Sequence, residues 1–172
     1  MTENYLLAAL VENKPGVLHK VSNMFRSRGF NINSISVGLT QHPDISRMTI
    51  TINTDPARIQ QFVKQLRKLI DVIDVSLLEF PKSVYRELAL IKVHTPAGKA
   101  RAEIIGYANI FRARVVDVST EYLTMEITGT PDKIDAFMNL AKTYGLKEVS
   151  RTGVTAVPRE GNYVDSGDID DQ

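Results

Sequence analysis

The sequence contains no cysteine and only three histidines. The absence of cysteine excludes disulfide bonds, thiolate catalysis and zinc sites built on cysteine. His19, His42 and His94 lack the spacing of a metal-binding pair, and no GxSxG, P-loop or GxGxxG motif occurs. The sequence therefore shows no catalytic or metal-binding constellation.

An excess of one charge sign is also absent, because 21 Lys and Arg oppose 20 Asp and Glu, for a net charge of +1. Tight nucleic-acid binding usually needs a basic face, and the total charge gives no sign of one. The start, MTENYLLAALVENK, has no basic n-region and too short an apolar run to span a membrane. We therefore expect a soluble cytoplasmic protein without nucleic-acid or membrane partners.

Four segments show the apolar spacing of helices, and each follows a proline at the expected first helical position. Asp55, Thr95 and Thr130 are expected to cap the free N–H groups that follow. The four expected helix starts are Lys14-Pro15, Asp55-Pro56, Thr95-Pro96 and Thr130-Pro131.

Eight runs between and around these helices have the composition of β-strands. Read along the chain, strands and helices follow the order β-α-β-β-α-β twice. This order predicts an α+β protein of two tandem ferredoxin-like βαββαβ domains, each an antiparallel sheet with two helices on one face. The expected strands are residues 5–11, 32–39, 46–53, 74–80, 87–93, 114–120, 122–128 and 146–157.

Pro81 and a polar run interrupt the strand pattern near the middle of the chain, and we expect the domain boundary there. The predicted domains are residues 1–80 and 81–160. Residues 161–172 contain four Asp and no Lys or Arg, which predicts an acidic disordered tail.

The first strand has apolar residues on both faces, with Leu6, Ala8 and Leu10 alternating with Leu7, Ala9 and Val11. Helices cover one face only, so a second subunit or the second domain is expected to cover the other. A two-fold dimer is the simplest form of this expectation.

The stretch Asn13-Lys14-Pro15-Gly16 places a glycine and an asparagine at the start of the first helix. A helix N-terminus can hold a small carboxylate, and Gly16 would let a ligand approach the backbone closely. Asn13 can both donate and accept hydrogen bonds, as a free amino acid requires. These residues fit either an amino-acid site or a simple turn.

A family resemblance adds to this interpretation. The stretch LLAALVENKPGVLHKVSNMFRSRGFNINSISVG, followed by DISRMTITI, closely resembles the ACT domain of the small regulatory subunit of acetohydroxyacid synthase, also called acetolactate synthase. RELALIKV, IFRARVVDVS, EITGTPDKIDAF and EVSRTGV resemble the C-terminal domain of that family. The resemblance covers about residues 4 to 160.

The resemblance implies a non-catalytic partner of a large catalytic subunit in branched-chain amino acid biosynthesis. The catalytic subunit uses thiamin diphosphate and Mg²⁺ and usually holds FAD, and this chain is expected to bind none of them. The small subunit would activate the catalytic subunit and confer feedback inhibition by valine. Two alternatives are a free-standing amino-acid-sensing ACT protein with another target and a nucleic-acid-binding ferredoxin-like protein.

The resemblance also implies where the effector binds. It would lie between the ACT domains of two copies, which assigns effector binding and dimerisation to residues 1–80. One copy would supply the turn before the first helix and the other the start of the second strand. Carried onto this chain, the site residues are Asn13, Lys14, Pro15, Gly16, Val17 and Leu18, with Asn31, Ile32 and Asn33. Leu10, Val17 or Ile32 would line the effector's side chain.

Overall fold

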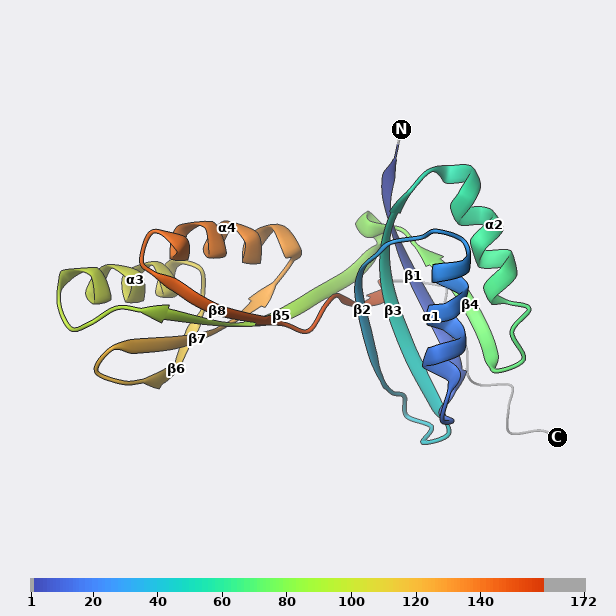
Figure 1. Ribbon diagram of the computed structural model, residues 1–172, viewed down its shortest axis with the longest axis horizontal. Coiled ribbons are helices and arrows are strands. Elements are labelled where there is room, and N and C mark those ends of the chain that lie inside the picture. The colour runs from blue at the N-terminus through green and yellow to red at the C-terminus, as the bar shows by residue number, and fades with distance from the viewer. Residues whose placement is uncertain (1, 160–172) are drawn as a thin grey trace. The chain divides into compact units, whose positions relative to one another are not determined.

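A computed structural model of the chain describes residues 2–159. Within this part the chain forms two compact units (Figure 1). The first unit contains the residues up to Val84 together with those from Val154 on, and the second contains Tyr85–Gly153. The expected acidic tail, residues 161–172, lies outside the described residues.

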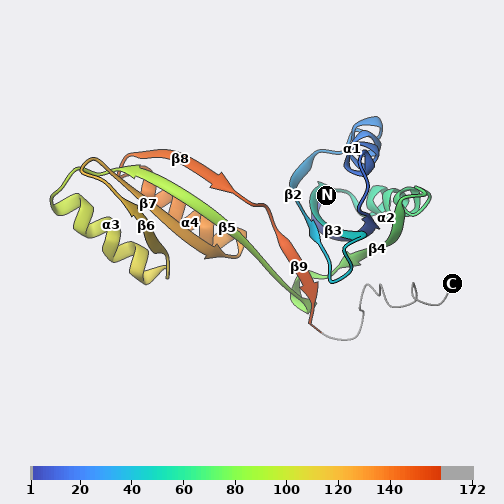
Figure 2. The same cartoon turned by 90° about the horizontal axis from the view of Figure 1, so that it is seen from below.

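The first unit is an antiparallel sheet with both helices on one face (Figures 1 and 2). Its strands lie in the order β2-β3-β1-β4, so that β2 and β4 are the edges. The elements are β1 (Glu3–Glu12), α1 (Val17–Ser27), β2 (Ile32–Leu39), β3 (Ile45–Thr54), α2 (Pro56–Leu66), β4 (Val72–Leu78) and the 3-10 turn η1 (Phe80–Lys82).

The second unit repeats this arrangement with strand order β6-β7-β5-β8, and a short strand β9 pairs with β5. The order βαββαβ therefore occurs twice, and the predicted fold class is confirmed. The elements are β5 (Ser83–His94), α3 (Lys99–Ile110), β6 (Arg114–Val118), β7 (Tyr122–Gly129), α4 (Pro131–Lys142) and β8 (Leu146–Arg151). The strand β9 (Thr155–Pro158) pairs with β5 but belongs to the first unit.

Two of the four helices begin at the predicted prolines, α2 at Pro56 and α4 at Pro131. The prediction is wrong for α1 and α3, which begin only after a glycine. Gly16 before α1 has φ of 88° and Gly98 before α3 has φ of 142°. Glycine adopts such angles readily, so the chain turns at the glycine and the helix starts at the next residue.

Of the three predicted caps, only Asp55 caps a helix with its side chain. Its Oδ1 accepts the backbone N–H of Arg58 at 2.9 Å. Thr130 stands at the N-cap of α4 without a side-chain hydrogen bond to the helix, and Thr95 lies four residues before α3. The capping prediction is therefore wrong for both threonines.

The core of the first unit lies between the sheet and its two helices. Leu7, Ala9 and Val11 of β1 are at most 2% exposed and face this core. The ring of Phe62 on α2 packs 4.3 Å from Phe25 on α1, measured between centroids. Burial of such side chains contributes about 1.5–3 kcal/mol each. This packing fixes α1 on the sheet and thereby positions its N-terminus.

The opposite face of the same sheet is also buried, and part of its cover is the chain's own segment from Val154. The hydroxyl of Ser36 donates to the Val154 carbonyl at 2.7 Å, and the Ser34 hydroxyl accepts the Val154 N–H at 3.3 Å. Half-buried Arg47, whose pKa is lowered by desolvation, donates to the Ala156 carbonyl at 2.9 Å. A second subunit is therefore not needed to bury this face, and burial of this face does not by itself indicate a dimer.

Candidate functional site

The turn before α1 leaves its helix start open. The φ of Gly16 is 88°, and a Cβ built on this glycine would meet no atom within 4 Å. The side of the turn where a side chain would stand is therefore empty. A ligand can approach the backbone there without displacing any side chain.

The first turn of α1 has backbone donors without acceptors. The Lys20 N–H makes the first helical bond, to the Gly16 carbonyl at 3.0 Å, and the Val17 N–H reaches the Lys14 carbonyl at 3.4 Å. Within residues 2–159, the N–H groups of Leu18 and His19 have no acceptor, and no side chain caps the helix. Two free N–H groups at a positive helix end are suited to a carboxylate.

The charged side chains around this turn are already paired. The Lys14 ammonium lies 3.0 Å from the Glu12 carboxylate, and this hydrogen bond is the main cause of the raised pKa of Lys14. The Lys20 ammonium lies 2.6 Å from the carboxylate of Asp71, which is mostly buried. A bound carboxylate would therefore meet backbone N–H groups rather than an unpaired ammonium.

Asn13 joins the end of β1 to the β2–β3 hairpin. Its Nδ2 donates to the Pro43 carbonyl at 3.0 Å, and its Oδ1 accepts the Ser46 hydroxyl at 3.3 Å. A carboxamide has two N–H donors and two acceptor lone pairs, so half of this capacity remains for a ligand. The structure thus shows a clamping role for Asn13 that the sequence did not indicate.

We expect Asn13→Ala to destabilise the first unit by about 1 kcal/mol, because the two hydrogen bonds that join the Asn13 side chain to the hairpin are lost. Urea unfolding of the variant and the unchanged chain measures this difference. Asn23→Ala, on the exposed face of α1, is the matched control and should not lower stability, because alanine favours a helix more than asparagine does. An Asn13→Ala variant as stable as the unchanged chain would contradict the clamping role.

The apolar residues predicted to line the effector's side chain are mostly buried, whereas Leu18 is exposed. Val17 is 3% exposed and packs in the core, and Leu10 is 2% exposed. Ile32 packs against the same core. Leu18 is 47% exposed and stands on the first turn of the open helix. Leu18 is therefore the apolar side chain that this end of the helix offers.

Asn31 and Asn33 stand at the start of β2, which follows the C-terminal end of α1, whereas Gly16 precedes its N-terminal end. Figure 1 shows the loop from the end of α1 leading into β2. The helix has 11 residues, or roughly 16 Å at 1.5 Å per residue. The pairing of β2 with β3 shifts register between Ile32 and Ser34, so Asn33 lies at a bulge at the start of an edge strand. One copy of the chain therefore does not bring the two predicted halves of the site together.

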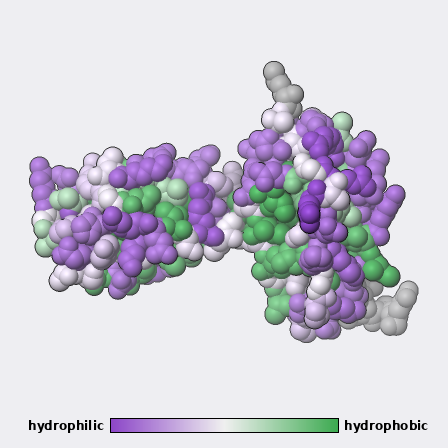
Figure 3. Space-filling view, in the orientation of Figure 1, coloured by the Kyte–Doolittle hydropathy of each residue, from purple (hydrophilic) through white to green (hydrophobic). Residues whose placement is uncertain are grey.

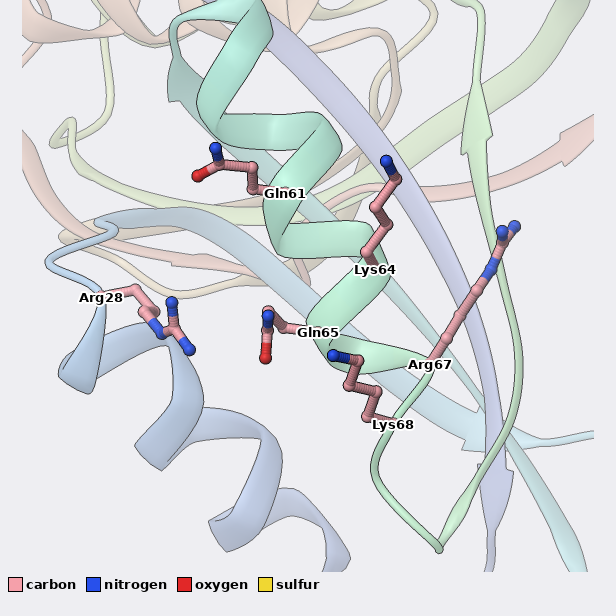
Figure 4. A pocket seen from close by; sticks show the side chains of 6 residues that line it. All are labelled: Arg28, Gln61, Lys64, Gln65, Arg67 and Lys68. Carbon is pink, nitrogen blue, oxygen red and sulfur yellow. The ribbon is translucent and has the colours of Figure 1, made fainter.

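A hollow of about 530 Å³ lies between the end of α1 and the exposed side of α2 (Figure 4). Sequence reasoning did not predict it. Among residues 2–159, no cluster of three or more acidic or histidine side chains is placed to hold a metal ion. No helix in this part of the chain is long and apolar enough to cross a membrane. The hollow is lined by Arg28, Gln61, Lys64, Gln65, Arg67 and Lys68.

Two family models match the chain, one in each half. Residues 7–74 match the ACT domain of acetohydroxyacid synthase small subunits, and residues 86–160 match the small subunit of acetolactate synthase. The chain is 50% identical over 158 residues to the acetolactate synthase small subunit of Mycolicibacterium smegmatis, covering 92% of both chains. The chain belongs to the family of acetolactate synthase small subunits. The predicted family is therefore confirmed.

Other members of the family agree in sequence and in structure. The small subunit from Aquifex aeolicus is 47% identical, over 91% of this chain and 81% of its own. The crystal structure of the small subunit from Thermotoga maritima superposes with a TM-score of 0.86 at 41% identity, over 93% of this chain and 99% of that one. Small subunits of this family are regulatory, and the ACT match contains both the open helix start and the beginning of β2.

Proposed function

We propose that this small subunit binds valine between the ACT domains of two copies and transmits that binding to a catalytic subunit of acetolactate synthase. The observation that carries this proposal is the open start of α1. Free N–H groups on Leu18 and His19 and the empty side of Gly16 form a place for the carboxylate of an amino acid. Exposed Leu18 offers an apolar contact for its side chain.

The edge strand β2 supports a dimer that completes this site. It is an outer strand of the sheet and exposes Val37 by 48% and Leu39 by 65%. Figure 3 shows an apolar surface over this part of the first unit. Exposed apolar edge strands tend to pair with another strand. In a two-fold pairing of β2 edges the two strands run in opposite directions, which carries the Asn31–Asn33 end of one copy toward the Gly16 end of the other.

The regulatory effect follows from thermodynamic linkage between valine binding and the activity state of the assembly. Valine shifts the assembly toward a less active state only if it binds that state more tightly than the active one. A coupling of ~1–3 kcal/mol between the effector and the catalytic subunit is typical of such systems. The small subunit contributes activation and inhibition, whereas thiamin diphosphate, Mg²⁺ and FAD belong to the catalytic subunit.

Isothermal titration of the chain with valine, leucine and isoleucine tests the site, both alone and in the assembly with its catalytic subunit. We expect saturable valine binding near one site per chain or one per two chains. Asn31→Ala should weaken binding roughly 10- to 100-fold, since a hydrogen bond to a charged group is worth about 1.5–3 kcal/mol. Asn23→Ala is again the matched control. Absence of binding in both preparations would refute the proposal.

A further inference from the structure

The two helices of the first unit contain no acidic residue. From Asn13 to Pro43 the chain has no Asp or Glu, and none occurs from Pro56 to Ile70. The helices of the second unit differ, because α3 contains Glu103 and α4 contains two Asp. The helix layer of the first unit consists of α1, α2 and the turns that end them. Every charged side chain in this layer is basic, although the chain as a whole is nearly neutral.

Most of these basic groups have no counter-charge. Lys20 pairs with Asp71 and Arg58 with Asp55. Within residues 2–159 the other five form no ion pair, and all five are exposed. We call these five the basic face: Arg26, Arg28, Lys64, Arg67 and Lys68.

Helix stability does not explain this pattern. The helix dipole favours cations near the C-terminus, which fits Arg26 and Lys64 in the last turns. The same dipole favours an acid at the helix start, which α2 has in its N-cap Asp55 and α1 lacks. The lack of acidic residues within both helices therefore points to an anionic partner rather than to the helices themselves.

The basic face is wider than the hollow it borders. In Figure 4 the side chains of Arg28, Gln65 and Lys68 point into the space between α1 and α2. Arg67 also lines the hollow, but its guanidinium turns away from Arg28 and donates to the Val75 carbonyl at 2.6 Å. Arg26 is not among the lining residues. A small anion in the hollow would therefore meet only some of these cations, whereas an extended acidic surface can meet all of them.

A second copy of the chain does not fit this face. In a two-fold contact the same patch meets itself, so the five cations of one copy would face the same five of the other. Like charges placed opposite one another are unfavourable. The basic face is therefore separate from the contact that we assign to β2.

We propose that the basic face is the surface through which the first unit docks onto an acidic surface of the catalytic subunit. This inference rests on the proposed function, because it takes the catalytic subunit as the partner. Complementary charge would speed association and fix its orientation, and the affinity would fall with salt.

The test compares two triple variants in assembly with the catalytic subunit. Arg28→Gln/Lys64→Gln/Lys68→Gln neutralises the basic face but keeps Arg67, which holds β4. Arg114→Gln/Lys142→Gln/Lys147→Gln removes the same residue types from exposed positions of the second unit. The readout is the Kd for the catalytic subunit, from titrated activation of its activity, at low and at high salt.

We expect the basic-face variant to bind the catalytic subunit roughly 10- to 100-fold more weakly and with less salt dependence, and the control variant to bind unchanged. Both isolated variants should still bind valine like the unchanged chain, which shows that they are folded. If the unchanged chain itself fails to activate the catalytic subunit, the proposed function fails. If it activates and the basic-face variant binds equally well, only the docking surface is refuted.

Other anions give distinct results that would also overturn the docking proposal. Inorganic triphosphate that binds the unchanged chain but not the basic-face variant, with no change in subunit affinity, would assign the face to a small polyanion. Salt-dependent binding of a single-stranded RNA, lost in the same variant and again without a change in subunit affinity, would assign it to nucleic acid.

Discussion

Replacing Gly16 by aspartate is expected to abolish measurable valine binding and valine inhibition while activation of the catalytic subunit persists. The Cβ would enter the empty space at the start of α1, and the carboxylate would stand beside the place proposed for the carboxylate of valine. It would also accept the free N–H groups of Leu18 or His19 as a helix cap. The ligand would thus lose its donors and meet a like charge.

The matched control is Gly16→Asn, which has nearly the same size and the same strain at φ of 88° but no charge. Asn and Asp both tolerate left-handed backbone better than other side chains do. Asn should retain part of the binding and Asp none, as measured by titration and by inhibition assays. Wild-type inhibition in the Asp variant would remove Gly16 from the site.

Mixed dimers test whether the two halves of the site come from different copies. Gly16→Asp and Asn31→Ala each damage both sites of a homodimer. A dimer of one chain of each kind has one doubly damaged site and one site with an intact Gly16 and an intact Asn31. Co-expressed and differently tagged chains should therefore regain one normal valine site per mixed dimer. A site formed within a single chain would show no such recovery.

Replacing Arg151 by methionine is expected to lower the stability of the second unit strongly. Arg151 lies between Glu87, which is 4% exposed, and Asp135 on α4. Burial by itself lowers the pKa of Arg151, but the hydrogen bonds to Glu87 and Asp135 outweigh it and raise the pKa. Removing the arginine leaves the Glu87 carboxylate buried without a partner. Loss of one member of a buried pair costs about 3–5 kcal/mol, and we expect about 3 because Arg151 is partly exposed.

Hydrogen exchange and urea unfolding measure this effect. Exchange should increase in Tyr85–Gly153 and stay unchanged in the first unit, because the network lies within the second unit. The double variant Glu87→Gln/Arg151→Met should recover most of the lost stability, since a neutral amide is less costly to bury than an unpaired charge. Equal stability of the single and double variants would show that the uncompensated carboxylate is not the cause.

Local chemistry was enough to predict the fold class and the position of most elements. The two βαββαβ repeats follow from the alternation of strand-like and helix-like apolar spacing, and Asp55-Pro56 marked the true start of α2. The prolines before α1 and α3 misled the prediction, because proline fits both the first turn of a helix and the turn that leads to one. The positive φ angles of Gly16 and Gly98, which decide the helix starts, arise in the folded backbone.

For the site, the sequence by itself placed Asn13–Leu18 at the start of a helix, and it contains no acidic residue within α1 or α2. The tertiary structure decided the rest, because each remaining feature depends on contacts between segments distant in sequence. It turned Asn13 toward the hairpin, buried Val17 and left Leu18 exposed. It placed Asn31 and Gly16 at opposite ends of one helix, and it brought the segment from Val154 back onto the first sheet. Side-chain type can be read along a chain, whereas accessibility and proximity are properties of the packed molecule.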